Sequence, residues 1–301
     1  MAGGGPQGGD PVLAVVGAPA QPEPMTAEPM TAEPPTRPSG RGAVPRRTGP
    51  LADLIDLVLP ACCAACQDPG VVLCADCVSG WWPGPRRRDQ DAPRLDRLDG
   101  RGPLPVWAAA DYQGAVRRTV LAWKDGGRLE LTRWLAGLAA ETALGMRTAL
   151  HDRGPDAGSL LVVPAPPSAA GRRRRGEDLL RPLAAAVAAG LTATGVPAQV
   201  LPCLRTRRAH RDQVGLGRRG RGANLADRIA VRRRLRGHPA LLGPPRPVLL
   251  IDDVLTTGAT LAACRRVIDA AGQRVVAALV LAATPPPTHR SGGVEPRAAP
   301  G

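Results

Sequence analysis

The chain has 301 residues, enough for one or two domains with a substantial core, and 44% of them are apolar. Aromatic residues make up only 2%, and phenylalanine is absent, so the core must consist mainly of Leu, Val and Ala. The net charge of +14 favours attraction to polyanions such as nucleotides, pyrophosphate or nucleic acid, without choosing among them. No run approaches the ~18–20 apolar residues of a membrane span, so no such span is expected.

Residues 1–47 are rich in Gly, Pro and Ala and cannot bury enough surface to offset the entropy of ordering, so we expect a disordered tail. Residues 12–20 form an apolar patch, but no basic segment precedes it and its apolar core is shorter than that of a signal peptide. These features predict a cytoplasmic protein.

A short amphipathic helix is expected over residues 51–59, and it leads into a cluster of cysteines. Within residues 51–84, two CxxC pairs have the spacing of a structural zinc site, with the expected ligands Cys63, Cys66, Cys74 and Cys77. Disulfides are the alternative, which fits poorly without a secretion signal. Cys62 competes with Cys63 as the first ligand. Cys203 and Cys264 have no His partner at a useful spacing and are expected to be buried apolar residues.

Apolar runs alternate with segments of helical spacing from residue 104 to residue 283. This alternation predicts an α/β domain with a mainly parallel sheet, followed by a disordered tail over residues 284–301. The expected strands are residues 106–111, 160–164, 197–204, 247–251 and 274–283. The expected helices are residues 113–123, residues 128 to about 144, an Ala/Leu helix that ends near Gly190, and a helix from Thr260 to Gly272.

Residues 247–272 combine a buried strand, two acids and a Thr/Gly turn before a helix. The turn would lie at the carboxyl end of the strand, where helix N–H groups and the helix dipole favour a phosphate. It has no Lys, which argues against a Walker loop. Asp252 and Asp253 would repel a bare phosphate but suit a ligand that also carries hydroxyls, such as ribose 5-phosphate.

The sequence of this stretch, VLLIDDVLTTGAT, closely resembles the phosphoribosyl pyrophosphate signature of type I phosphoribosyltransferases. Four further segments occur in the order seen in ComF-like proteins, a phosphoribosyltransferase-like family named for competence for DNA uptake: DYQGAVRRTVLAWK, LVVPAPPS, RRRRGEDLL and QVGLGRRGRGANLA. With the cysteine cluster, the resemblance covers about residues 51–283. The single Tyr, Lys and Asn of the chain, Tyr112, Lys124 and Asn224, all match it.

The resemblance implies a type I phosphoribosyltransferase fold that binds phosphoribosyl pyrophosphate with Mg²⁺ and transfers its phosphoribosyl group to an unknown acceptor. Residues 163–168 take the place of the pyrophosphate loop, and residues 205–224 that of a flexible loop with Arg218 among its arginines. The implied catalytic residues are Asp252, Asp253, Lys124, Arg207 and Arg211. The implied ligand-binding residues are Asp252, Asp253, Thr256, Thr257, Gly258, Ala259, Thr260, Pro164, Ala165, Pro166 and Gln213.

One segment departs from the family pattern. Where relatives have Gly-Phe-Asn-Gln after the arginine run, this chain has Gly-Glu-Asp-Leu at residues 176–179. The departure leaves a non-catalytic phosphoribosyl pyrophosphate-binding protein as an alternative. A second alternative is an accessory protein of DNA uptake that binds single-stranded DNA through its zinc module and the arginines of residues 172–175 and 232–236. The sequence leaves the acceptor and the oligomeric state open.

Overall fold

The structure is a computed structural model that describes residues 42–44, 62–81, 84–92, 95, 103–151, 159–167, 178–207 and 228–286. The chain divides into two compact units, residues 1–37 and 38–301, and all described residues belong to the second. The helix expected over residues 51–59 and most of both predicted tails lie outside the described residues, as do Arg211 and Gln213.

A six-stranded sheet forms the centre of the described domain, with the strand order β1-β2-β8-β7-β3-β4. Only the pairing of β1 with β2 is antiparallel, which confirms the predicted α/β fold with a mainly parallel sheet. The strands are β1 (Arg86–Arg87), β2 (Val106–Ala108), β3 (Leu160–Pro164), β4 (Ala198–Val200), β7 (Pro247–Leu255) and β8 (Arg274–Ala283). The two central strands, β7 and β8, are almost entirely buried, as continuous apolar runs predict.

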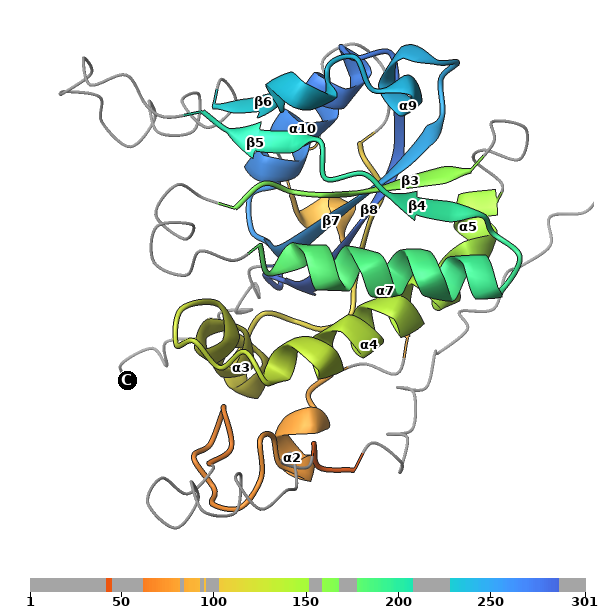
Figure 1. The fold of residues 1–301 in the computed structure, drawn as a ribbon. Coiled ribbons are helices and arrows are strands. Elements are labelled where there is room, and N and C mark those ends of the chain that lie inside the picture. Colours follow the sequence, from red (N-terminus) through yellow and green to blue (C-terminus); the bar gives the residue numbers. More distant parts are fainter. Residues whose placement is uncertain are drawn as a thin grey trace, which may run out of the picture. The chain divides into compact units, whose positions relative to one another are not determined.

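Helices cover both faces of this sheet (Figure 1). On one face α4 packs against α7, whose apolar residues recur every three or four positions from Leu180 to Leu191. On the other face, α10 packs against β7 and β8. Pro182 lies in the first turn of α7, where a missing N–H costs no helical hydrogen bond. The helices are α3 (Gly114–Lys124), α4 (Leu131–Gly145), α5 (Arg147–His151), α7 (Leu180–Ala193) and α10 (Ala259–Asp269).

A small antiparallel sheet of β5 (Leu204–Thr206) and β6 (Ile229–Val231) lies beside α10, followed by the short helices η3 (Arg233–Leu235) and α9 (Pro239–Leu242). The single strand predicted for residues 197–204 is therefore wrong. The chain instead forms β4 in the main sheet and then β5 in the small one. Pro202, which has no N–H to donate, lies where the chain leaves the main sheet.

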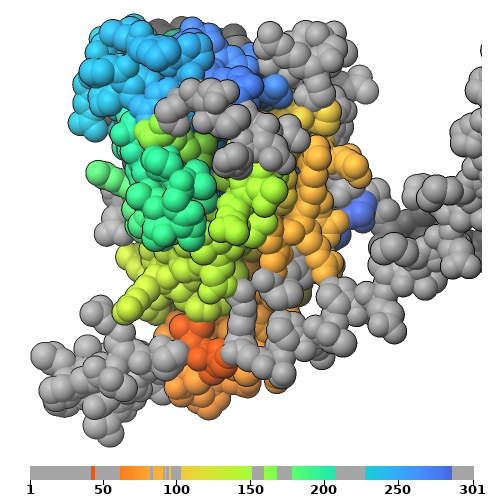
Figure 2. Space-filling model, turned by 90° about the vertical axis from the view of Figure 1, so that its right-hand side faces the viewer, coloured from red at the N-terminus to blue at the C-terminus, as the bar shows by residue number. Residues whose placement is uncertain are grey.

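Residues 62–81, here called the cysteine module, contain α2 (Ala75–Val78) and are followed by η1 (Asp89–Asp91). Val44, within the predicted amino-terminal tail, pairs with Leu73 of this module. The module is attached to the α/β domain by side chains of that domain: Arg118 of α3 donates to the carbonyl of Ala65 at 2.7 Å. In Figures 1 and 2 the module lies at the end of the domain near α3, and the β5–β6 sheet with α9 lies at the other end.

Among the described residues, no helix has both the length and the apolar character that crossing a bilayer requires.

Candidate functional site at the carboxyl edge of the sheet

Strand β7 extends beyond its neighbour β3 and carries both acids of the motif. The last residue pair between the two strands joins Pro164 to Ile251, whereas β7 remains paired with β8 as far as Leu255. The expectation that the strand ends at residue 251 is therefore corrected, because β8 is long enough to pair with three more residues of β7, namely Asp252, Val254 and Leu255. Asp252 and Asp253 lie within the strand, on a stretch whose other edge has no β3 partner.

The two carboxylates have different surroundings. Successive side chains of a strand point to opposite faces, so Asp252 and Asp253 cannot point the same way. Asp252 is 9% exposed, close enough to Cys264 of α10 for its charge to raise the pKa of that buried thiol further. The side chain of Asp253 is 15% exposed and forms an ion pair with Lys124. One acid therefore faces the α10 side of the sheet and the other faces α3.

Burial and a neighbouring charge change the protonation of Asp252. Burial, and next the negative charge of Asp253, raise the pKa of Asp252 from 3.8 to about 7, so near neutral pH this carboxyl holds its proton part of the time. Burial alone would lower the pKa of Lys124, but the charges of Asp253 and Asp252 outweigh it and raise that pKa. Lys124 is therefore a permanent cation at the end of α3, held against the more exposed acid.

The segment that follows β3 lies directly beside these acids. The Ala165 N–H donates to the carbonyl of Ile251 at 2.8 Å, which places the predicted pyrophosphate loop next to the acidic end of β7. Pro164 and Ala165 are buried, and Pro166 is half-buried. The hydroxyl of Thr206, at the end of β5, donates to the carbonyl of Pro167 at 2.9 Å and fixes the loop from the other side.

The turn between β7 and α10 presents its threonines to solvent. Thr256 and Thr257 are exposed and Thr260 is half-buried, while Ala259 is the first residue of α10. The first-turn N–H groups of a helix have no partner within it, and the N-cap residue Gly258 supplies no side-chain acceptor for them. Exposed hydroxyls and unpaired N–H donors thus lie together at the positive end of the α10 dipole.

Gly258 has a packing requirement in addition to its predicted place in the ligand site. A Cβ at this position would lie 2.7 Å from Cγ of Leu95. Its φ of 78° is also in the left-handed region, where a side chain is strained. Gly258 therefore leaves room for the side chain of Leu95, while Thr256 and Thr257 are exposed.

Arg207, the predicted catalytic arginine among the described residues, forms no ion pair with Asp252 or Asp253. Arg207 lies at the end of the β5–β6 sheet, where its N–H donates to the carbonyl of Arg228, and its side chain lines a groove beside the second half of α10. Within the described residues, no carboxylate lies at ion-pair distance from Arg207. Its role as a catalytic arginine stays a prediction, as do those of Arg211 and Gln213.

One ion pair at the same edge was missed by the sequence reasoning. Asp111 pairs with Ala283 at the end of β8, and Nη2 of Arg88 lies 2.7 Å from its carboxylate. The available signal was the position of Asp111 directly after an apolar run that was expected to be a strand. Arg88 gave no signal, because its nearness to Asp111 depends on the antiparallel pairing of β1 with β2.

Four sulfur atoms converge in the cysteine module. The Sγ atoms of Cys63, Cys66, Cys74 and Cys77 all lie within 4.8 Å of one another, and those of Cys66 and Cys74 are 3.5 Å apart. A zinc tetrahedron with Zn–S distances of about 2.3 Å has similar spacings between its sulfurs. Burial raises the pKa of the Cys63 thiol, but backbone N–H donors outweigh it and lower that pKa to about 6.

This convergence separates the two candidates for the first metal ligand. Cys63 belongs to the cluster, whereas Cys62 does not, and the carbonyl of Cys62 accepts a hydrogen bond from Arg128 at 2.8 Å. Cys203 and Cys264 are fully buried and lie outside the cluster, which confirms that they are core residues. The cluster is compatible with a structural metal site.

Fold and site together define an α/β protein with an acidic pair at the carboxyl edge of its sheet and a four-cysteine module. No protein-family model matches the chain. No curated protein matches it either. Among solved structures, it is similar to the adenine phosphoribosyltransferase of Thermoanaerobacter pseudethanolicus, with 14% sequence identity, a TM-score of 0.28, and coverage of 55% of this chain and 73% of that chain.

Proposed function

We propose that the carboxyl edge of the sheet binds phosphoribosyl pyrophosphate and that the protein transfers the phosphoribosyl group to an acceptor. The observation that carries this proposal is the adjacency of three segments from distant parts of the sequence. The acidic end of β7, the loop after β3 and the end of α3 meet at this edge. Each of them supplies one kind of group that a ribose carrying a pyrophosphate needs.

The 5′-phosphate is assigned to the turn of residues 256–260. Its exposed hydroxyls and the free N–H groups of the first turn of α10 are donors, and the helix dipole favours a negative charge there. The ribose hydroxyls are assigned to the acids. Asp253 accepts hydrogen bonds from the ribose hydroxyls once Lys124 no longer pairs with it. Asp252 is buried beside it, and because its pKa is raised to about 7, it limits the negative charge that the two acids carry together.

The pyrophosphate is assigned to residues 164–166 and Lys124. Lys124 keeps its proton and exchanges its partner from Asp253 to the pyrophosphate, so that the cation moves to the group that gains negative charge. Carboxylate oxygens suit Mg²⁺, and the partly exposed Asp253 is the described residue that fits it best. Mg²⁺, when bound, would neutralise charge on the pyrophosphate. In the transfer, the bond from ribose C1 to pyrophosphate oxygen breaks, pyrophosphate leaves with the electron pair, and a nucleophilic acceptor forms the new bond to C1.

Calorimetry with phosphoribosyl pyrophosphate and Mg²⁺ tests the binding step. The double variant Asp252→Asn/Asp253→Asn should lose binding, and Lys124→Met should weaken it roughly tenfold, because a charge-assisted contact is worth about 1.5–3 kcal/mol. Asp269→Asn is the matched control, since this acid lies at the far end of α10 in a pair with Arg265 and should leave the affinity unchanged. Failure of the wild-type protein to bind the ligand would refute the proposal.

Pyrophosphate release with a panel of purine and pyrimidine bases then separates a transferase from a non-catalytic binding protein. Asp178, part of the segment that departs from the family pattern, has a buried Oδ1 without a hydrogen-bond partner among the described residues. Binding without release for any base would assign the protein to the non-catalytic class, and that result would leave the ligand site intact.

A second candidate function is an accessory role in DNA uptake, favoured by a cluster of arginines. Four of them line one shallow hollow next to the β5–β6 sheet: Arg205, Arg232, Arg233 and Arg234. The chain has no aromatic residue after Trp134, so bases have nothing to stack on in this region and binding would depend on phosphates. An affinity for single-stranded DNA that falls steeply with salt supports this function, and a flat salt dependence rules it out.

For the cysteine module we propose a structural Zn²⁺ held by Cys63, Cys66, Cys74 and Cys77. The set of four thiolates is closed and has no open position for chemistry. None of the seven cysteines forms a disulfide, so all four thiol groups of the cluster are available as ligands.

A further inference from the structure

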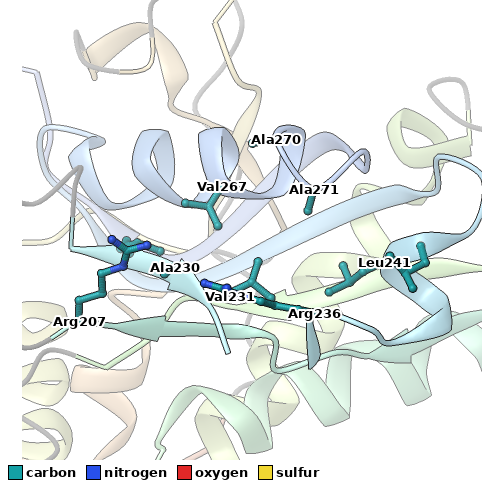
Figure 3. A pocket seen from close by; sticks show the side chains of 10 residues that line it. Arg207, Ala230, Val231, Arg236, Leu241, Val267, Ala270 and Ala271 are labelled. Carbon is teal, nitrogen blue, oxygen red and sulfur yellow. The ribbon is translucent and has the colours of Figure 1, made fainter. Parts of the chain in front are cut away.

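A groove of about 480 Å³ lies between β6, α9 and the second half of α10 (Figure 3). It is remote from the turn of residues 256–260, because it contacts α10 near its end, at Val267, Ala270 and Ala271. Its volume is in the range of sites for single small ligands. Apart from Arg207, whose catalytic role stays a prediction, none of the groups assigned above to phosphoribosyl pyrophosphate lines this groove.

The walls of the groove are apolar. Val231 of β6 and Leu241 of α9 face Val267 and Ala271 of α10 across it. Leu242, at the end of α9, is 71% exposed, the most of any large apolar side chain among the described residues. A bare phosphate or a metal ion would gain nothing from such walls, whereas a hydrocarbon or aromatic body would be removed from water.

Two guanidinium groups complete the lining. Arg207 and Arg236 lie on the β6 side of the groove in Figure 3, and no described carboxylate forms an ion pair with either. The sequence explains this excess of positive charge, since residues 228–251 contain six arginines and no acid. Guanidinium groups at the border of an apolar surface favour a planar anion such as a carboxylate.

The geometry points to a binding site for a small amphipathic carboxylate, with its anionic group toward Arg207 and Arg236 and its apolar body between β6 and α10. Apart from Arg207, the site shares no residue with the proposed phosphoribosyl transfer. Arg207 lies at the end of the β5–β6 sheet and directly precedes residues 208–227. A ligand in the groove would therefore contact both this end of the sheet and α10.

The neighbouring arginine cluster serves as the contrast. Arg205, Arg232, Arg233 and Arg234 line a separate hollow with no described aliphatic wall, which suits phosphates rather than an amphipathic ligand. Arg236 and Arg233 are both exposed and lie three positions apart, yet only Arg236 lines the groove. They therefore form a matched pair for mutation, in which the same charge is removed inside and outside the site.

The test is a titration of the full chain with decanoate, followed by calorimetry and by the methyl NMR signals of Val231 and Val267. Decanoate should shift both methyl groups. Arg236→Ala should weaken its binding roughly tenfold, as expected for the loss of a charge-assisted hydrogen bond, whereas Arg233→Ala should leave it within about twofold of wild type. Decanol, which has the same body without charge, should bind roughly tenfold more weakly than decanoate.

Four results would overturn the assignment. They are unmoved methyl signals, equal losses in Arg236→Ala and Arg233→Ala, equal binding of decanol and decanoate, and displacement of decanoate by inorganic phosphate at equal concentration. A single-stranded oligonucleotide that shifts both methyl groups at lower concentration than decanoate would assign the groove to nucleic acid and also overturn it. Since Arg236 is exposed, its replacement should not disturb folding, and an unchanged melting temperature verifies this.

Discussion

The cysteine module and the carboxyl edge of the sheet bring functional groups together in different ways. In the module, all four thiols come from residues 63–77, and the chain between them is too short to separate them far. At the sheet edge, the groups come from Lys124, from Ala165 and from Asp253, which only the complete sheet brings together. The comparison teaches that local spacing specifies the four-cysteine cluster, whereas the candidate ligand site depends on how far each strand extends.

Metal removal should have the largest effect, because it should unfold the cysteine module and leave the sheet edge folded. A structural zinc can contribute roughly 10 kcal/mol to the folding of a small module. Chelation, or Cys63→Ser, should expose the amides of residues 62–78 to hydrogen exchange while those of β7 and β8 stay protected. The measurements are zinc content and exchange by mass spectrometry. Cys62→Ser is the control and should retain the metal, and loss of zinc in that variant would contradict the ligand set.

The next largest effect is expected at the sheet edge, from Gly258→Ala. The added Cβ would lie 2.7 Å from Leu95, at a backbone φ of 78°, so strain and overlap together should cost roughly 2–4 kcal/mol of unfolding free energy. Gly127→Ala separates the two causes, since its φ is 73° with no atom within 4 Å, and it should cost only about 1–2 kcal/mol. Chemical denaturation measures both. Leu95→Ala should partly rescue Gly258→Ala, and equal costs at the two glycines would exclude the overlap.

A smaller effect concerns the pH dependence of stability in metal-free buffer. The pKa of Asp252 is raised from 3.8 to about 7, so between these values the folded state binds more protons than the unfolded state. Unfolding free energy from this group is therefore highest below about pH 4 and falls as the pH rises towards 7. The charged or titratable groups that face Asp252 are Asp253, Lys124 and Cys264. Asp252→Asn should be more stable than wild type at pH 8, by about 1–3 kcal/mol, and a variant that retains the wild-type pH profile would contradict this.

The smallest effect should come from the contact that joins the two regions. Arg118→Ala removes the hydrogen bond to Ala65 and should cost about 1 kcal/mol, because the contact is partly exposed. Faster amide exchange should appear in both α3 and residues 62–67. Arg117→Ala, the adjacent exposed arginine of the same helix, should change neither. If zinc content and exchange are the same in both variants, the module and α3 are not coupled through this bond.

Particular elements show how much the sequence predicted. The strands at residues 160–164 and 274–283 are found as predicted, because each is a continuous apolar run in the buried sheet. Residues 197–204 were mistaken for one strand, since the apolar pattern does not show that the chain changes sheets at Pro202. The missed partner of Asp111, Arg88, directly follows a two-residue strand with exposed side chains, Arg86–Arg87, which carries no hydrophobic signal.

The sequence by itself determined the α/β class, the members of the four-cysteine cluster and the acids and threonines of the candidate ligand site. These depend on periodicity and short spacings, which act between residues close in the chain. The tertiary structure alone decided that Asp252 faces the interior while Asp253 pairs with Lys124, and that Gly258 lies under Leu95. It also formed the groove with Arg207 and Arg236. These features depend on the relative lengths and packing of strands and helices far apart in the sequence, which no local pattern encodes.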